Sequence, residues 1–184
     1  RTRVVGEDLG TVPKYVRPSL QSLGIAGFKI PQWEFLHGRM TPGREFERLS
    51  VTTYATHDHK PIRQLWMEAL DETSTTREQA REDLLKIAQF AGIAPRECLE
   101  YERDFYPAMM TALFDSNSWI AIVMITDLLA RKDRFNVPGI ATASNWTRRL
   151  PKTIAQMRES RSVRRKMKVI RELLEKSGRI PATG

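Results

Sequence analysis

Four short stretches rich in β-branched and aromatic residues, near positions 5, 30, 53 and 122, are each followed by a helical pattern. The first begins at Arg1, and the second and fourth predict strands over 25–35 and 118–125. Helices are predicted from Pro13 and over 97–115, among others. Strands that alternate with helices are typical of a parallel sheet. Four such units make half of a (β/α)8 barrel, which usually needs about 250 residues. An open doubly wound sheet fits the same pattern. The sequence therefore predicts an α/β protein and leaves these two architectures open.

The positions of polar residues favour the barrel. They cluster where the predicted strands end, which is where barrel enzymes build their sites; these residues are Glu7, Asp8, Trp33, Glu34, His57, Asp58 and Asp127. Glu7 and Asp58 would lie on one rim of a parallel sheet, separated by one strand. Two carboxylates across a cleft suit glycosidic bond chemistry, although acidic residues also commonly cap the helices that follow strands.

Several motifs, in order along the chain, resemble one known family. They are Gly6-Glu7-Asp8-Leu9-Gly10 with Val12-Pro13, then Thr56-His57-Asp58, then Asn136-Val137-Pro138-Gly139, with Asn145-Trp146 and Arg148 downstream. Together they resemble the amylomaltase (4-α-glucanotransferase) family of retaining, α-amylase-type barrel enzymes, from residue 1 to about residue 151. The resemblance implies that the chain is the C-terminal half of the (β/α)8 TIM barrel, with about four βα units.

The resemblance also implies roles for individual residues. Glu7 would be the general acid/base, and Asp58 would hold the sugar hydroxyls and stabilise the oxocarbenium-like transition state. His57 would be the hydrogen-bonding partner of Asp58. Asp8 and Asn136 would contact substrate hydroxyls, and Trp33 would stack on a glucose ring. His59 stands where Asn is common in the family, which concerns acceptor specificity rather than reaction type.

The family's nucleophile, an Asp within an Arg-x-Asp motif, has no counterpart here, because Arg131-Lys132-Asp133 falls in a predicted loop after the last strand. We therefore expect the whole enzyme to transfer α-1,4-glucan segments between maltooligosaccharides by a retaining double displacement, and this chain alone to be inactive. The chemistry requires no cofactor and no metal. His57 and His59 could also bind zinc together with Glu7 or Asp8, but the spacing indicates no third ligand, which disfavours such a site.

The positive charge is confined to one end of the chain. The net charge is +8, but residues 148–179 contain twelve Lys and Arg against three Glu. Residues 151–176 also carry apolar side chains at helical spacing. We expect a domain at 1–150, the second half of the barrel, and a basic amphipathic helix with a short tail at 151–184 that packs on it. The alternative is a non-enzymatic α/β module that binds nucleic acid through this helix.

The composition bounds the remaining classes. With 41% hydrophobic and 28% charged residues the chain is typical of a soluble globular protein, and no apolar run approaches the roughly 18 residues needed to cross a bilayer. We expect no membrane partner and a cytoplasmic location. The chain begins at Arg1 without Met, and a half-barrel leaves two open sheet edges. We therefore expect a fragment whose edges are covered by the missing N-terminal half or a partner.

Overall fold

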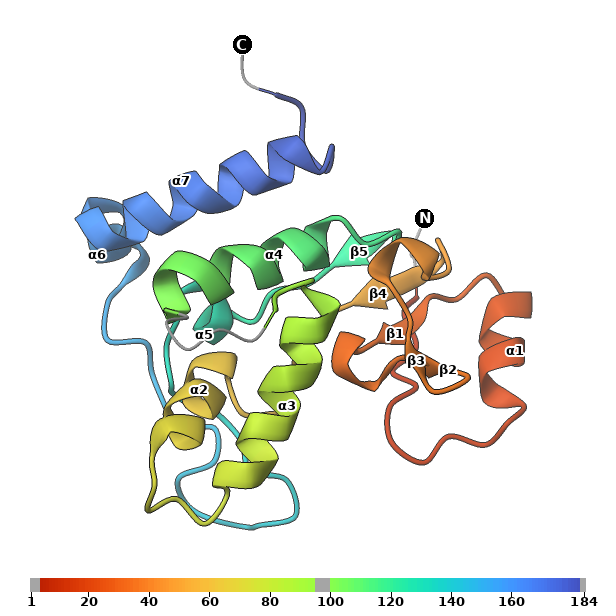
Figure 1. Cartoon of the computed structure of the whole chain (residues 1–184), viewed down its shortest axis with the longest axis horizontal. Helices are drawn as coiled ribbons and strands as arrows, with labels where there is room; N and C mark the ends of the chain where they lie inside the picture. The colour runs from red at the N-terminus through yellow and green to blue at the C-terminus, as the bar shows by residue number, and fades with distance from the viewer. Residues whose placement is uncertain (1–3, 95–99, 183–184) are drawn as a thin grey trace.

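The computed structural model describes residues 4–94 and 100–182 (Figure 1). Its helices and strands follow in the order α1 (Val16–Ser22), β1 (Gly27–Lys29), β2 (Phe35–Leu36), β3 (Arg39–Met40), β4 (Ser50–Thr52), α2 (Ile62–Leu70), α3 (Arg77–Phe90), α4 (Tyr106–Phe114), β5 (Ile120–Ala121), α5 (Ile125–Leu128), α6 (Ile154–Glu159) and α7 (Arg161–Lys176). Short 3₁₀ turns lie at Pro31–Trp33 and Gly43–Glu45, and a π-helical turn at Tyr101–Phe105 leads into α4.

The strands form the parallel sheet that the alternating pattern predicts. Its order is β1-β4-β5, with Gly27 opposite Ser50 and Val51 opposite Ile120. Val5 adds a single parallel bridge to Ala26, next to β1. The four predicted strand regions therefore lie side by side in chain order, although each forms less regular strand than expected. A separate two-stranded hairpin, β2-β3, follows β1.

The helices enclose the hydrophobic core beside this sheet. The α4 helix lies between α7 on one side and the α2–α3 pair on the other (Figure 1). Fully buried side chains come from α2, α3, α4 and the turn before α4; the largest of them are Ile62, Ile87, Phe105, Met109 and Leu113. The phenol of Tyr54, just after β4, donates to the Met109 carbonyl at 2.7 Å and so ties the sheet to α4. Burial of these side chains supplies most of the stabilisation of such a fold.

Two hydrogen-bonded contacts between residues far apart in the sequence hold helix ends in place. The buried carboxylate of Asp127, in α5, accepts the backbone N–H of Ile62 at 2.8 Å, at the first turn of α2. The guanidinium of Arg179 donates to the Phe114 carbonyl at 2.6 Å and to the Ser116 carbonyl at 2.8 Å. Both contacts satisfy backbone groups that a helix end leaves without intrahelical partners.

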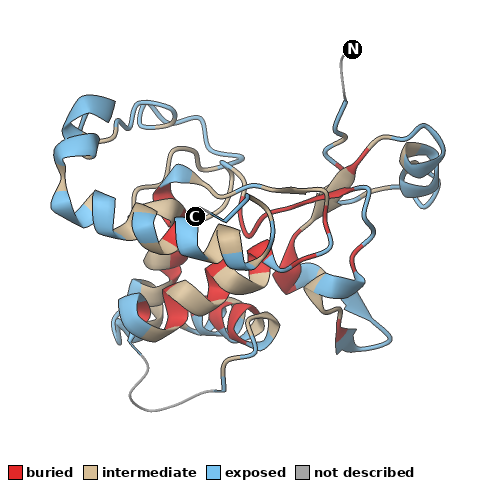
Figure 2. Cartoon of the chain, turned by 90° about the horizontal axis from the view of Figure 1, so that it is seen from above, coloured by how far each residue is buried: buried red, intermediate tan, exposed pale blue. Residues whose placement is uncertain are grey.

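Several expected elements are shorter or interrupted. The helix expected from Pro13 begins at Val16 and buries no side chain, so Leu23 is exposed (Figure 2). The strand expected over 25–35 ends at Lys29, since Pro31 has no N–H for a sheet ladder. The strand expected over 118–125 is reduced to β5, and the chain then turns into α5. Residues 1–3 and 97–99, which were expected to belong to a strand and a helix, lie outside the described residues.

The C-terminal segment is two helices rather than one. Ser160 is extended, with φ −73° and ψ 118°, and separates α6 from α7. Thr153 caps α6 with a capping box, and Ile154 is exposed rather than docked. The apolar face of α7 packs on the core through Ile170, Met167 and Leu173, as expected for an amphipathic helix. In the described part of the chain, no helix combines the length and apolarity that a membrane span requires.

Candidate functional site

The centre of the candidate site is the turn that follows β4. Residues 53–55 at the end of the strand are buried, and the chain then makes a turn in which the His59 N–H donates to the Thr56 carbonyl at 3.1 Å. This turn carries His57 and Asp58 out of the core. Burial of the strand fixes where the turn begins, and the turn leaves both side chains partly exposed, at 47% and 38%.

The Asp58 carboxylate is held by a residue far away in the sequence. The Asn136 side-chain amide donates to Asp58 Oδ1 at 2.6 Å. His57 Nε2 lies 3.3 Å from the same oxygen, and the Arg134 guanidinium donates to the Asp58 backbone carbonyl at 2.5 Å. The carboxylate is thereby oriented while remaining accessible to solvent. An oriented, accessible carboxylate can accept hydrogen bonds from sugar hydroxyls and stabilise positive charge that develops nearby.

The loop that supplies Asn136 is itself held in place by side chains. Arg134 donates to the Asn136 carbonyl at 2.7 Å. The Asn145 amide accepts the Val137 N–H and donates to the Val137 carbonyl, both at 3.1 Å. The Trp146 N–H then donates to the Phe135 carbonyl at 2.8 Å. The Asn-Val-Pro-Gly and Asn-Trp motifs are therefore parts of one folded loop that presents Asn136 to Asp58.

Two exposed tryptophans flank the turn. The Trp33 ring lies 5.0 Å from the His59 ring and is 48% exposed. The Trp146 ring lies 5.1 Å from the His57 ring and is 62% exposed. Aromatic faces of this kind are suitable stacking surfaces for sugar rings. By contrast, Trp66 packs against Tyr101 and Phe105 in the core.

Glu7 lies at the same end of the sheet as the turn that follows β4. It follows the Val5–Ala26 bridge, and β1 separates that bridge from β4. Because all these segments run parallel, their carboxyl ends meet at one edge. The Glu7 side chain is exposed, and within residues 4–94 and 100–182 no hydrogen bond or ion pair joins it to Asp58.

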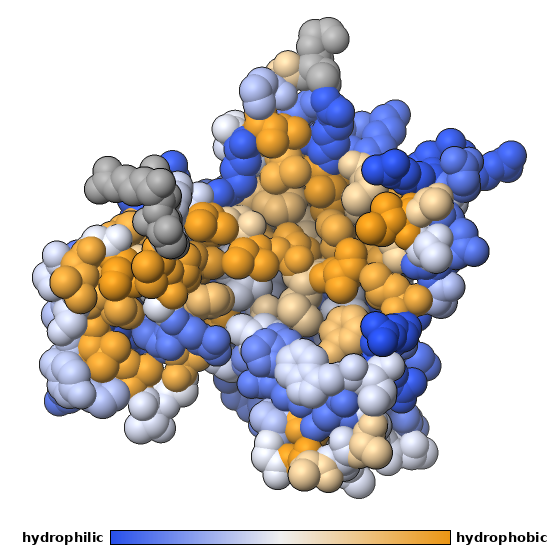
Figure 3. Space-filling model, turned by 180° about the vertical axis from the view of Figure 1, so that it is seen from behind, coloured by the Kyte–Doolittle hydropathy of each residue, from blue (hydrophilic) through white to orange (hydrophobic). Residues whose placement is uncertain are grey.

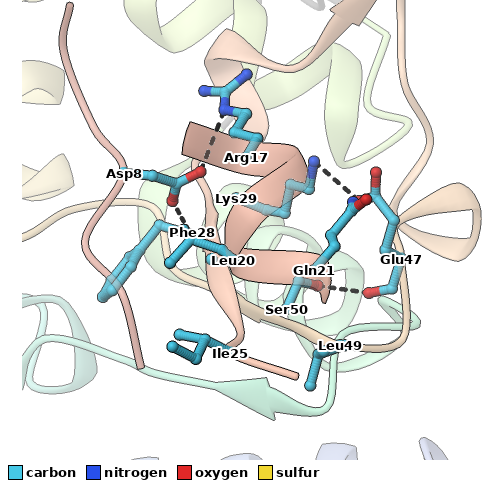
Figure 4. Close-up of a pocket in the computed structure, with 11 residues that line it drawn as sticks. Asp8, Arg17, Leu20, Gln21, Ile25, Phe28, Lys29, Glu47, Leu49 and Ser50 are labelled. Carbon is cyan, nitrogen blue, oxygen red and sulfur yellow. Dashed lines mark hydrogen bonds and ion pairs between the residues drawn. The ribbon is translucent and has the colours of Figure 1, made fainter. Parts of the chain in front are cut away.

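Asp8 lies in a different environment from the one expected. It is 6% exposed, its Oδ1 accepts the Phe28 N–H at 2.6 Å, and its Oδ2 pairs with Arg17 Nε at 3.1 Å (Figure 4). The carboxylate therefore ties β1 to α1. Gly27 is required beside it, because a Cβ there would come within 2.9 Å of Asp8 Oδ1. A contact between Asp8 and a substrate hydroxyl stays a prediction.

Charged neighbours complete this side of the molecule. Lys29 and Glu47 line the pocket drawn in Figure 4, where Lys29 Nζ lies 2.9 Å from Glu47. Lys29 Nζ also lies 3.5 Å from Glu34. Burial raises the pKa of Glu34, against the opposing effect of Lys29.

Burial also raises the pKa of Asp127 to about 7, and the only described hydrogen bond of that carboxylate is to the first turn of α2. Asp127, which the sequence places at a strand end among the polar residues of a possible site, is thus a helix-capping residue.

The structure brings together three of the six predicted site residues, His57, Asp58 and Asn136, and joins Trp33 to them through His59. Sequence reasoning missed Arg134, and it named His59 only as a departure from the family pattern and as a possible zinc ligand. Arg134 could have been found from its position two residues before Asn136. Among the described residues, no group of three or more His, Cys, Asp or Glu could hold a metal ion.

Residues 1–155 match the family model described as 4-alpha-glucanotransferase. The 4-alpha-glucanotransferase of Chlamydia trachomatis serovar D is 29% identical over 166 residues, covering 83% of this chain and 29% of the relative. The chloroplastic/amyloplastic 4-alpha-glucanotransferase of Arabidopsis thaliana is 27% identical over 155 residues, covering 82% of this chain and 24% of the relative. The chain therefore spans less than a third of the length of these curated relatives.

Solved structures share the fold. The amylomaltase from Corynebacterium glutamicum superposes with a TM-score of 0.68 at 23% identity, covering 91% of this chain and 28% of the neighbour. The Streptococcus agalactiae amylomaltase in complex with acarbose gives 0.66 at 18% identity, covering 95% and 31%. These matches do not favour the alternative of a nucleic-acid-binding module.

Proposed function

The chain belongs to the 4-alpha-glucanotransferase family, and from this premise we propose that it supplies half of the active site of an enzyme that transfers α-1,4-glucan segments to the 4-hydroxyl of an acceptor sugar. The observation that carries the proposal is the Asp58 carboxylate, oriented by Asn136 at 2.6 Å and placed beside His57 at the carboxyl edge of a parallel sheet. That edge is where parallel α/β folds place their sites.

In this proposal Glu7 and Asp58 have separate roles. Glu7 protonates the departing O4 while an Asp outside this chain attacks C1 and forms the glycosyl intermediate. The Glu7 carboxylate then removes the proton of the acceptor 4-hydroxyl, which attacks C1 and displaces the Asp. Two displacements retain the α-configuration, and they require the nucleophile and Glu7 to lie about 5 to 5.5 Å apart. Asp58 stabilises the oxocarbenium-like transition state of both steps.

The other site residues bind substrate. His57 and Asn136 orient Asp58 and share the sugar hydroxyls with it, and Trp33 offers a stacking face. Asp8 contacts a substrate hydroxyl only if it exchanges its ion pair with Arg17. The substrates are α-1,4-glucans and maltooligosaccharides, and no step needs a cofactor or a metal.

We propose that residues 1–150 form the second half of a (β/α)8 barrel and that an N-terminal half covers the open sheet. In support, β5 pairs only with β4 in the described part of the chain. Apolar side chains along the strand regions are exposed, among them Val4, Val5, Leu49 and Ile122. A broad hydrophobic surface is visible from behind (Figure 3), and surfaces of that kind mark contacts with further protein. In the C-terminal segment, α7 packs on α4.

The test is Glu7→Gln in the full-length protein, with glucose release from maltotriose as the readout. We expect the rate to fall by about 10² to 10⁴-fold, because a general acid/base group contributes that much. The matched control is Glu72→Gln, at an exposed residue two positions beyond the end of α2. A Glu7→Gln enzyme with near wild-type turnover would show that Glu7 is not the acid/base.

A further inference from the structure

His59 connects two parts of the candidate site that are separate in the sequence. It ends the turn that carries Asp58, and its ring folds back over that turn. His59 Nδ1 accepts the Thr56 backbone N–H at 3.0 Å and lies 2.8 Å from Thr56 Oγ1. The same ring lies 5.0 Å from Trp33, tilted by 54°. One imidazole therefore contacts both the turn after β4 and the aromatic surface after β1.

The hydrogen bonds determine the protonation state of this ring. Because Nδ1 accepts a backbone N–H, it carries no proton, and the neutral ring must hold its proton on Nε2. Thr56 Oγ1, which lies 2.8 Å from Nδ1, also accepts the Asp58 N–H at 3.4 Å. A proton on Nδ1 would remove the acceptor of the Thr56 N–H, so the turn geometry depends on the neutral form.

The surroundings favour that neutral form. Burial lowers the pKa of His59, and the Arg134 and His57 groups add to this effect, while the Asp58 carboxylate and the backbone hydrogen bond with Thr56 oppose it. Trp33, on the other face, carries no charge. Relative to the ordinary value near 6.5, His59 is therefore neutral at pH 7, and the turn loses its Nδ1 acceptor only as the pH falls.

We propose that neutral His59 is a positioning residue that sets the Asp58 turn and the Trp33 ring together, so that the carboxylate and the stacking surface engage one sugar chain in register. This inference rests on the proposed function, in which both groups touch substrate. The hydrogen bond accepted by Nδ1 holds the turn that carries Asp58, so its loss should lower kcat. The packing of the His59 ring on Trp33 holds the stacking surface, so its loss should weaken substrate binding.

Two variants of the full-length protein separate these roles. In His59→Asn, the side-chain oxygen lies as many bonds from the backbone as Nδ1 and can accept the Thr56 N–H, but no ring packs on Trp33. His59→Leu removes both contacts. The control is His37→Asn, since His37 is exposed in the β2-β3 hairpin and its φ of 51° suits Asn.

The readouts are kcat and KM for maltotriose disproportionation from pH 4.5 to 8, and maltotriose binding followed by tryptophan fluorescence. We expect His59→Asn to keep kcat within about threefold at pH 7 and to raise KM and the dissociation constant roughly three- to tenfold, the scale of an aromatic contact. In this variant, the acidic limb of the pH profile of kcat/KM should show one protonation fewer than in the wild type. We expect His59→Leu to lower kcat by a further factor of about ten, the scale of one hydrogen bond.

The outcomes keep this inference apart from the proposed function. A wild-type enzyme that neither binds nor disproportionates maltotriose overturns the proposed function. With an active wild type, an Asn variant whose KM and pH profile match the wild type overturns the role of His59, and this holds even if the Leu variant does not fold. An Asn variant whose kcat falls as far as that of the Leu variant overturns the role of the Nδ1 acceptor.

Discussion

Replacing Asp127 by Asn should change how the free energy of unfolding depends on pH. Asp127 is 3% exposed, and its one described hydrogen bond accepts the Ile62 N–H at 2.8 Å. Burial raises the pKa of this carboxyl to about 7, and the Ile62 hydrogen bond opposes the rise only in part. An Asn side chain keeps the oxygen that caps α2 but has no proton to release, so the variant isolates the effect of titration.

The magnitude follows from the two pKa values. An unfolded Asp titrates near 3.9, and the folded Asp127 titrates near 7. Because the folded value is raised, the protonated group contributes its full stabilisation below about pH 4. That contribution is lost as the pH rises through 7. Three pH units at 1.36 kcal/mol each correspond to roughly 4 kcal/mol of unfolding free energy between these limits.

Urea unfolding followed by circular dichroism, at half-unit steps from pH 4 to pH 8, measures this difference. We expect the stability of the wild type relative to Asp127→Asn to fall by a few kcal/mol across the window, most steeply between pH 5 and 7. Asp115→Asn, at an exposed carboxyl, is the control and should follow the wild-type curve. Parallel curves for the wild type and Asp127→Asn would refute the reasoning.

Two further substitutions test contacts described above. Asn136→Ala removes the 2.6 Å hydrogen bond to Asp58 and should lower kcat/KM about 10- to 100-fold in the full-length enzyme, the scale of a hydrogen bond to a charged group. The control is Ser144→Ala, at an exposed residue, which should leave kcat/KM unchanged. Equal activity of the two variants would contradict the role of Asn136. Arg179→Met leaves the Phe114 carbonyl without its 2.6 Å donor and should lower the free energy of unfolding, measured in urea, by roughly 1–3 kcal/mol. The control is Lys176→Met, at an exposed residue. A loss no larger than that of the control would show that this contact does not stabilise α4.

Local patterns were sufficient for the order of the sheet. Runs such as Ser50–Ala55 combine β-branched and aromatic residues and end at polar ones, so a parallel strand at this position follows from the βα repeat, whereas its register against β1 does not. The same reasoning placed His57 and Asp58 at a strand end. The lengths of the elements were less predictable, because Ser160 interrupts a continuous apolar stripe without any Gly or Pro.

The partners of the site residues depended on long-range contacts. Asn136 lies 78 residues from Asp58, and the family resemblance assigned Asn136 to substrate hydroxyls rather than to Asp58. The buried pairing of Asp8 with Arg17 and Phe28 has no sequence signal at all, because an acidic residue after a strand fits a cap, a ligand contact or a buried tie equally well. Burial of a charged group is decided by packing that a single sequence does not encode locally.

The two long-range hydrogen bonds of this region together make a closed circuit. The chain runs from Asp58 to Ile62, crosses to Asp127, continues to Asn136 and returns to Asp58. The Asp58 carboxylate and the start of α2 are therefore members of one macrocycle, closed by two hydrogen bonds in place of covalent links. Loss of either hydrogen bond opens this loop and lengthens the flexible path between the groups that the other bond joins, so Asp127 and Asn136 together limit the freedom of the segment that carries Asp58.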